Sequence, residues 1–340
     1  MPNQPEIFDV TIIGGGPVGL FTAFYSGMRE MKTKIIEYLP YLGGKVSYFY
    51  PEKMIRDIGG IKQLSGEQLA ANLIEQAMTF DPTIVLSEQV EGMERLHDGT
   101  FVLNSSNGSK HYTKTIILAT GFGTLKSVKL AIPNAVDFEE KSLHYSIKKI
   151  SDYKGKKVLI SGGGNSAVDW ANELEPIADK VTLIYRKSNF SGIESNLTKL
   201  MKSSVNVLFP YEIVKINGEN GRLTSVVINK VGSPNVEEIM LDSLIVNHGF
   251  HIDLGPIAEW GLNMNEDMIQ VNNAMSTSIP GIFAVGDIAD YPNKLSLIAG
   301  GFNEGPIAVN GAKQFISPKE AIGHLYSTHY EPLIKNNKRK

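Results

Sequence analysis

Three closely spaced glycines near the start of the chain have the spacing of a phosphate-binding turn. In GGGPVG, Gly14, Gly16 and Gly19 fit the pattern GxGxxG between an apolar run and a helix that opens with Pro17. One glycine makes the bend, one admits a diphosphate, and one lets strand and helix pack closely. Glu37 closes the next apolar run, where an acid binds adenosine ribose hydroxyls. A simple tight turn needs no such acid, so the pattern predicts a dinucleotide site.

A second glycine turn lies in the middle of the chain. The sequence GGGNSA at 162–167 has the GxGxxA form, after the apolar run KKVLIS and before a helix-like segment. A helix that starts there offers free N–H groups and its positive dipole end to phosphates. We therefore expect a second dinucleotide site, with candidate contacts from Gly162, Gly164, Asn165, Ser166 and Ala167.

Two basic residues stand where the second site would otherwise have an acid. The strand expected at 181–185 ends in Arg186 and Lys187. An acid would repel the 2′-phosphate of NADPH, whereas a guanidinium can bind it with two hydrogen bonds and an ammonium adds charge. A solvated basic turn is the alternative reading. The placement favours NADPH over NADH.

The composition excludes several classes of chemistry. The 340 residues include no cysteine, which excludes a disulfide framework, a thiolate metal site and a CxxC redox relay made by this chain. The net charge of -3 gives no strong field for nucleic acid. His248 and His251 lack the further ligands of a metal site. No run of about 18 apolar residues and no signal-peptide pattern occurs, so we expect a cytoplasmic protein without a membrane partner.

The elements around the two turns predict the fold. Each turn joins an apolar strand to a helix, and a late apolar strand, GIFAVGD at 281–287, is followed by another helix. The late strand fits a first domain that the second one interrupts. We expect an α/β chain of two Rossmann-like, three-layer dinucleotide-binding domains, the first discontinuous, over 1–122 with 281–340, and the second over 123–280.

The motifs together resemble a known family. GGGPVG, Glu37, LGG at 42–44, ATG at 119–121, GGGNSA and GIFAVGD are similar to those of pyridine-nucleotide-dependent flavoproteins with a thioredoxin-reductase-like fold, over nearly the whole chain. The resemblance implies FAD at the first turn and NADPH at the second. It also implies that Asp287 binds the ribitol and pyrophosphate portion of FAD.

Within that fold, the absence of cysteine points to one group. The chain resembles the ferredoxin or flavodoxin NADP reductases through YPEK at 50–53, LHYS at 143–146 and LIAGGFNEGPIAVN at 297–310. The resemblance implies a homodimer, a Tyr50 that stacks on one flavin face, and further FAD contacts from Lys45, Asp57, Val90, Phe122 and Thr328.

The other flavin face is covered in those reductases by a histidine followed by Ser-Thr. Here the C-terminal Ser-Thr pair follows Tyr326, so Tyr326 takes that role in our expectation, with His324 as the alternative. The chain departs from the family in two more places. Asn165 stands where an Asp is usual, and Ser191 replaces a third basic residue near the 2′-phosphate.

These observations lead to one expected function and two alternatives. The first is electron transfer between NADPH and ferredoxin or flavodoxin through FAD, with no essential protein acid or base because the flavin carries the chemistry. The second is an NADPH diaphorase that reduces quinones or free flavin. The third is a non-catalytic module that senses FAD or NADPH.

Overall fold

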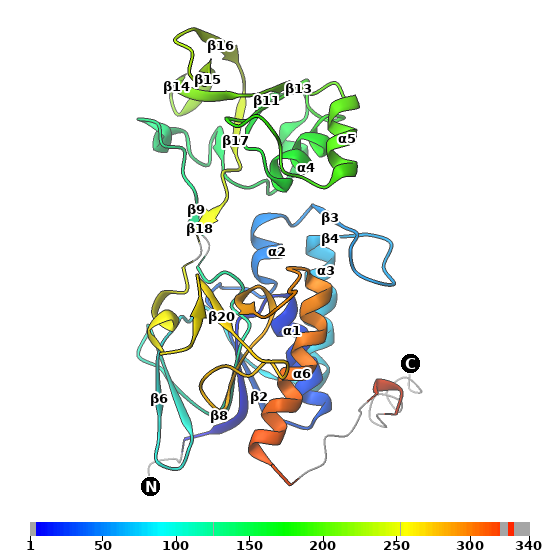
Figure 1. Ribbon diagram of the computed structural model, residues 1–340, viewed down its shortest axis with the longest axis vertical. Coiled ribbons are helices and arrows are strands. Elements are labelled where there is room, and N and C mark those ends of the chain that lie inside the picture. Colours follow the sequence, from blue (N-terminus) through cyan, green and yellow to red (C-terminus); the bar gives the residue numbers. More distant parts are fainter. Residues whose placement is uncertain (1–4, 125, 252, 320–325, 330–340) are drawn as a thin grey trace. The chain divides into compact units, whose positions relative to one another are not determined.

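The chain folds into two compact units. The computed structural model describes residues 5–124, 126–251, 253–319 and 326–329. The discontinuous unit comprises Met1–Thr124 and Ile252–Lys340, and the inserted unit comprises Leu125–His251 (Figure 1). Among the described residues, no helix is long and apolar enough to cross a membrane.

The discontinuous unit is built on a seven-stranded sheet of order β5-β2-β1-β8-β7-β6, with β21 paired to β8. The strands β5, β2, β1, β8 and β21 are parallel, while β6, β7 and the first half of β8 form an antiparallel meander. The bounds are β1 Ile7–Ile13, β2 Thr33–Ile36, β5 Thr83–Val85, β6 Val90–Arg95, β7 Phe101–Ser105, β8 Lys110–Leu118 and β21 Ile282–Ala284.

Helices cover one face of this sheet. Figure 1 shows α1, α3 and α6 side by side, and each of α3 and α6 contacts α1. Their bounds are α1 Pro17–Met28, α3 Gly66–Ala77 and α6 Ile298–Ile316, with the shorter α2 at Gly44–Phe49 and the hairpin β3 Met54–Ile55, β4 Leu64–Ser65 nearby in sequence. The start of α3 is fixed by a capping box between Ser65 and Gln68.

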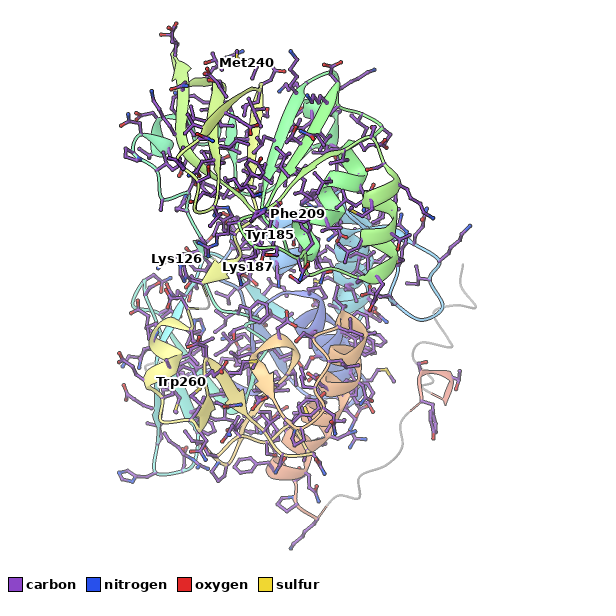
Figure 2. All side chains as sticks on the ribbon, turned by 45° about the horizontal axis from the view of Figure 1, so that its top comes forward. Lys126, Tyr185, Lys187, Phe209, Met240 and Trp260 are labelled. Atoms are coloured by element: carbon purple, nitrogen blue, oxygen red, sulfur yellow. The ribbon has the colours of Figure 1, made fainter. Side chains whose placement is uncertain are left out.

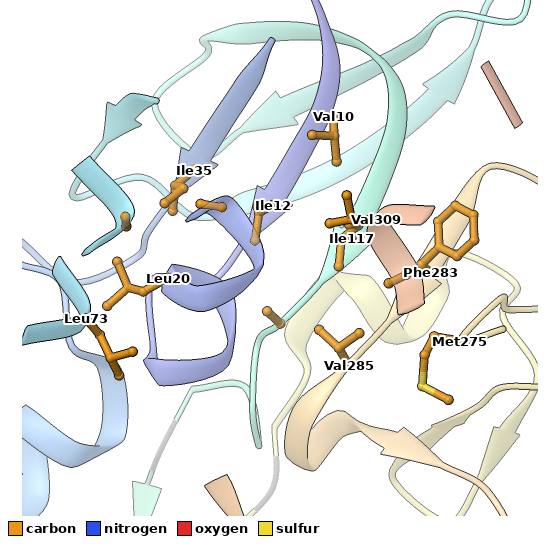
Figure 3. Packing of buried hydrophobic residues seen from close by; sticks show 14 of the residues in the cluster. Val10, Ile12, Leu20, Ile35, Leu73, Ile117, Met275, Phe283, Val285 and Val309 are labelled. Carbon is orange, nitrogen blue, oxygen red and sulfur yellow. The ribbon is translucent and has the colours of Figure 1, made fainter. Parts of the chain in front are cut away.

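The core follows the two-residue period of the strands. Val10 and Ile12 of β1 pack on the helix side with Leu20 of α1 and Val309 of α6 (Figure 3). Ile13 points to a second cluster on the opposite face. Both faces of β1 are therefore buried, as expected for a central parallel strand.

The second part of the discontinuous unit begins earlier than we expected. Residues 253–280, predicted to lie in the inserted domain, belong to the discontinuous unit. Leu254, Ile257 and Leu262 pack against the sheet in the second cluster, and Ile269 pairs with Ala289. The elements within 253–280 are short, so no long apolar run marked them; they are η4 Gly255–Glu259, β19 Met264–Asn265 and β20 Met268–Gln270. The elements η5 Gly286–Ile288 and β22 Ala289–Asp290 follow β21.

The inserted unit has a five-stranded parallel sheet of order β10-β17-β11-β12-β13. A three-stranded antiparallel sheet, β14-β15-β16, adds a second layer, and β9 pairs with β18 where the chain enters and leaves. The bounds are β9 Lys126–Ser127, β10 Leu143–His144, β11 Lys157–Ser161, α4 Asn165–Leu174, β12 Lys180–Ile184, α5 Glu194–Lys202, β13 Asn206–Leu208, β14 Tyr211–Glu219, β15 Arg222–Lys230, β16 Val236–Met240, β17 Ser243–Val246 and β18 Phe250–His251. The expected α/β class with two Rossmann-like units is confirmed.

Candidate functional site

The first glycine turn joins β1 to α1, and two of its glycines are required by the protein itself. Gly14 has φ +109°, and a Cβ there would collide with the carbonyl of Ala119. A Cβ on Gly19 would collide with the carbonyl of Gly14. These positions make the bend and the close strand–helix contact, as the sequence predicted.

Gly16 is different, because nothing in the protein requires it to be glycine. Its φ of -75° is ordinary for any residue, and among the described residues only Gly44 Cα, at 3.9 Å, lies within 4 Å of an added Cβ. It precedes α1, which has no side-chain cap and no acid in its first turn. Open space in front of uncapped helix N–H groups fits the diphosphate of FAD.

Glu37 follows β2 directly and faces this turn. Its Oε2 accepts a hydrogen bond of 2.6 Å from the Gly15 N–H, and its Oε1 accepts one of 2.8 Å from the Leu39 N–H. Burial raises the pKa of Glu37, while these backbone hydrogen bonds act in the opposite direction. The carboxylate is therefore held at the edge of the turn, where ribose hydroxyls of an adenosine can reach it.

A third group of predicted residues gathers around Asp287. The Lys45 Nζ lies 3.7 Å from Asp287 Oδ2 and 4.2 Å from the centre of the Phe122 ring. Burial lowers the pKa of the Lys45 ammonium, and Asp287 opposes this shift. Burial, with the charges of Asp287 and Asp57, raises the pKa of Tyr50 to about 12. Tyr50 is thus a neutral ring beside a Lys-Asp pair.

Val90 does not join this group through its side chain. It is the first residue of β6, and its side chain is buried in the second core cluster with Ile36 and Leu254. Tyr326 and Thr328 are exposed at η6, Ser327–His329, and His324 lies outside the described residues. The roles of these three residues at the flavin stay predictions.

The second glycine turn, in the inserted unit, repeats the first. A Cβ on Gly162 would collide with the carbonyl of Asn247, whereas a Cβ on Gly164 would have no atom of the described part of the chain within 4 Å. Gly164 has an ordinary φ of -90° and precedes α4, which also lacks a side-chain cap and a first-turn acid. Asn165 Oδ1 accepts a hydrogen bond of 3.0 Å from the Ile193 N–H. The same open helix end is therefore present for a second diphosphate.

Each turn contains an equivalent backbone hydrogen bond, so the two turns can be aligned residue by residue. Gly14 N–H donates to Ile36 O over 2.9 Å, and Gly162 N–H donates to Ile184 O over 3.0 Å. The residues that follow those two acceptors are Glu37 and Tyr185. Tyr185, rather than Arg186, thus occupies the place of the ribose-binding acid, and Arg186 and Lys187 follow it as exposed residues.

The Tyr185 ring belongs to a small aromatic group. A Cβ on Gly163 would collide with that ring. Phe190 has its ring centre 5.4 Å from that of Tyr185 and 5.6 Å from that of Phe209. Figure 2 labels Tyr185, Lys187 and Phe209 on this part of the inserted unit. The group borders the turn at the end of β12.

Two residues that follow β17 were not predicted to lie at the second turn. The backbone carbonyl of Asn247 lies against Gly162, and its buried Oδ1 has no hydrogen-bond partner among the described residues. His248 Nε2 lies 2.8 Å from Ser161 Oγ, at the end of β11, and burial with help from Arg186 lowers the pKa of His248. Thr120, after β8, has its Cα near Gly14, and its buried hydroxyl likewise has no partner in the described part of the chain. The signal for all three was available: each follows a strand that neighbours a glycine turn.

Two Rossmann-like units, each with an open glycine turn at a helix start, define a chain that binds two dinucleotides. Residues 8–312 match the pyridine nucleotide-disulphide oxidoreductase family, and the chain belongs to it. Among the described residues, no cluster of three or more His, Asp or Glu side chains could hold a metal ion.

The chain is also similar to individual proteins and solved structures. The chain is 54% identical to ferredoxin–NADP reductase 1 of Bacillus velezensis, over 98% of this chain and 99% of that protein. It is 51% identical to ferredoxin–NADP reductase 1 of Listeria monocytogenes, over 98% and 100%. Among solved structures, Lactococcus lactis thioredoxin reductase is similar with a TM-score of 0.80 and 25% identity, over 92% and 99%.

Proposed function

We propose that this protein is an FAD-dependent reductase that transfers electrons between NADPH and ferredoxin. Relatives with more than half of their residues identical, over nearly the whole chain, are named ferredoxin–NADP reductase. The family description names disulphide oxidoreductases, but this chain has no cysteine. A dithiol of this chain therefore cannot receive the electrons, and they must pass from the flavin to an external acceptor.

The observation that carries the proposal is the pair of open glycine turns. Gly16 and Gly164 leave space at uncapped helix starts where neither backbone conformation nor protein packing demands a glycine. Two dinucleotides, FAD at the first turn and NADPH at the second, account for both.

Each site residue then has a binding or orienting role. FAD, when bound, accepts two electrons as a hydride and releases them one at a time, which suits a nicotinamide donor and a one-electron carrier. Glu37 holds the adenosine ribose of FAD, and Asp287, beside Lys45, holds its ribityl portion. Tyr50 covers one flavin face with a flat, neutral ring, and burial raises the pKa of its hydroxyl further, to about 12. No side chain has to donate a proton.

At the second turn, Arg186 and Lys187 bind the 2′-phosphate of NADPH. Their exposure leaves them accessible to a ligand, and the guanidinium can form paired hydrogen bonds with phosphate oxygens. Asn165, Ser166 and Ala167 line the start of α4, the expected position of the diphosphate. Tyr326, or else His324, covers the second flavin face in this proposal.

The test is to identify the released cofactor and to compare acceptors. We expect FAD on release, and faster NADPH oxidation with ferredoxin or flavodoxin than with a quinone or free flavin. Release of FMN alone would refute the assignment of the first turn. A preference for quinone would identify a diaphorase, and NADPH binding without turnover on any acceptor would identify a sensing module.

The proposal extends to a homodimer that acts in the cytoplasm. The support is the resemblance to the ferredoxin or flavodoxin reductases of this fold. Analytical ultracentrifugation should give twice the mass of one chain, and fractionation of cells should place the protein with cytoplasmic enzymes; a monomer or a membrane-bound fraction would contradict this part.

A further inference from the structure

A buried carboxylate lies behind the turn that carries Asp287. The side chain of Glu304, on α6, is 2% exposed, and that of Lys294 is 10% exposed. Glu304 Oε1 lies 2.5 Å from Lys294 Nζ and accepts a hydrogen bond of 2.7 Å from the Tyr291 hydroxyl. The predicted FAD contacts did not include these three residues.

This network holds the peptide of Gly286 from both sides. Glu304 Oε2 accepts a hydrogen bond of 2.6 Å from the Gly286 N–H, and Lys294 Nζ donates one of 2.8 Å to the Gly286 carbonyl. Gly286 has φ +74°, a conformation that costs little only for glycine. Both polar groups of this residue are therefore fixed by charged side chains, which form stronger hydrogen bonds than neutral partners do.

Asp287 is the next residue in the chain. Fixing Gly286 fixes the direction in which the chain presents the Asp287 side chain beside Lys45. A second contact limits the same turn, since a Cβ on Gly286 would lie 3.3 Å from Cγ2 of Val18, in the first turn of α1. The turn is thus packed against the helix that begins at the first glycine turn.

We propose that Glu304, with Lys294 and Tyr291, positions Asp287 for the flavin and so sets the affinity of the protein for FAD. Glu304 is a positioning residue, because it acts through Asp287. The inference rests on the proposed function, in which Asp287 binds FAD. Buried, fully paired polar networks are well suited to this task because each member has one favourable geometry.

A merely stabilising ion pair is the competing explanation. In that case Glu304 would contribute to folding, and its loss would affect FAD binding only through overall stability. Two residues that act through one contact give coupled effects on binding, whereas independent residues give effects that multiply. A double-mutant cycle between Glu304 and Asp287 therefore separates the two explanations.

The experiment titrates FAD into apoprotein of four full-length forms: unchanged, Glu304→Gln, Asp287→Asn and the double variant. We expect Glu304→Gln alone to raise the Kd for FAD about tenfold, as for loss of a charged hydrogen-bond partner. In the Asp287→Asn background the same change should raise it less than about twofold. If Glu304→Gln fails to fold, Tyr291→Phe, which removes one hydrogen bond to Glu304, can replace it in the double-mutant cycle with Asp287→Asn.

Asp9 supplies the matched control. It pairs with Lys114 Nζ over 2.7 Å and accepts a hydrogen bond of 2.9 Å from the Lys32 N–H, so it combines an ion pair with a backbone hydrogen bond as Glu304 does, at a more exposed place in β1. Asp9→Asn should leave the Kd for FAD unchanged. The inference would be overturned if Asp9→Asn lost as much FAD affinity as Glu304→Gln, or if the effects of Glu304→Gln and Asp287→Asn multiplied. Either result would leave the proposed function standing. An Asp287→Asn form with unchanged affinity would overturn both the inference and the proposed role of Asp287.

Discussion

At the scale of single residues, the two glycine turns use the same position for opposite purposes. Glu37 follows β2 and accepts the Gly15 N–H, whereas Tyr185 follows β12 and lays its ring against Gly163. Tyr185 has no carboxylate to bind ribose hydroxyls as Glu37 can, and its neutral side chain adds no charge that would repel a 2′-phosphate. Tyr185 is therefore compatible with NADPH, which Arg186 and Lys187 attract in our proposal.

Changing Tyr185 to Glu should shift the nucleotide preference. A carboxylate there accepts the 2′-hydroxyl of NADH and repels the 2′-phosphate of NADPH. We expect the Kd for NADPH to rise at least about tenfold, equivalent to about 1.4 kcal/mol, while NADH binds equally well or better. Equilibrium titration with both nucleotides measures this. Tyr185→Phe keeps the ring and should retain the NADPH preference; a similar loss in that form would show that the Tyr185 hydroxyl, and not the added charge of Glu, determines the preference.

Replacing Arg186 and Lys187 with neutral residues should remove the preference for NADPH over NADH without changing the binding of NADH. Each charge-assisted contact to phosphate contributes about 1.5 to 3 kcal/mol, or roughly tenfold or more in affinity. We expect the double Gln variant to raise the Michaelis constant for NADPH and to leave that for NADH unchanged. Equal efficiency with both nucleotides in the unmodified protein would refute the assignment.

At the scale of elements, the strand–turn–helix units separate folding from binding within a few residues. Gly14, Gly19 and Gly162 are demanded by neighbouring backbone. Gly16 and Gly164 are not, and they stand before helices without side-chain caps. The last two glycines are therefore the positions where function can be altered while the fold remains.

Alanine at Gly16 should weaken the binding of FAD, and alanine at Gly164 should weaken the binding of NADPH. A methyl group at Gly16 occupies the space expected for the FAD diphosphate, and one at Gly164 occupies that for NADPH. We expect apoprotein stability to change by less than about 1 kcal/mol, because the backbone angles suit alanine. Gly19→Ala should instead destabilise the protein through its collision with Gly14. Thermal unfolding of apoprotein, with FAD and NADPH titrations, distinguishes these cases; equal destabilisation by all three would contradict the reading.

Most of the two strand–turn–helix units could be predicted from the sequence because their residues are close together in the chain. The strand, turn and helix around Gly14 and Gly162 are adjacent in the chain, and their residue types carry the signal. The equivalence of Tyr185 with Glu37 was not predicted, because the basic pair after the strand was taken as the equivalent position, although Glu37 and Tyr185 lie the same distance along the chain from Gly14 and Gly162. The contacts of Glu304 with Gly286 and Lys294 also escaped, because helix and turn meet only in the folded protein.

Two histidines with lowered pKa values make the inserted unit sensitive to acid. Burial lowers the pKa of His144, and burial with Arg186 lowers that of His248. The native state then binds fewer protons than the unfolded state, so this stabilisation is present above the ordinary histidine value of about 6.5 and is lost as the pH falls below it. Thermal unfolding at pH 7.5 and 5 should show a smaller acid loss in the double variant His144→Gln, His248→Gln. Changing the exposed His97 should leave the acid loss as it is.

At the scale of the whole molecule, the order of the chain determines which parts each site depends on. The proposed FAD site draws on both parts of the discontinuous unit, since Glu37 and Tyr50 come from the first and Asp287 from the second. The second glycine turn and Arg186 lie within the inserted unit. Residues 253–280 contribute core contacts to the discontinuous unit, which the sequence could not indicate because their elements are two to five residues long.

The chain beyond α6 provides the last prediction, which concerns access to the flavin. Because α6 ends at Ile316 and Glu37 and Asp287 lie outside the removed segment, deletion of 318–340 should leave FAD bound. If Tyr326 or His324 covers a flavin face, its removal should change the rate of flavin reduction by NADPH and increase oxidation by oxygen and small acceptors. Rapid-mixing kinetics with NADPH, followed by steady-state transfer to ferredoxin, should show this change in the truncated form and in Tyr326→Ala. Tyr326→Phe keeps the ring and should behave as the unmodified protein if Tyr326 is the covering residue, whereas a change in the truncated form alone would exclude Tyr326 and leave His324 as the alternative to test by substitution. Reduction rates, flavin spectra and acceptor preference that stay the same after truncation would show that the segment has no part in electron transfer.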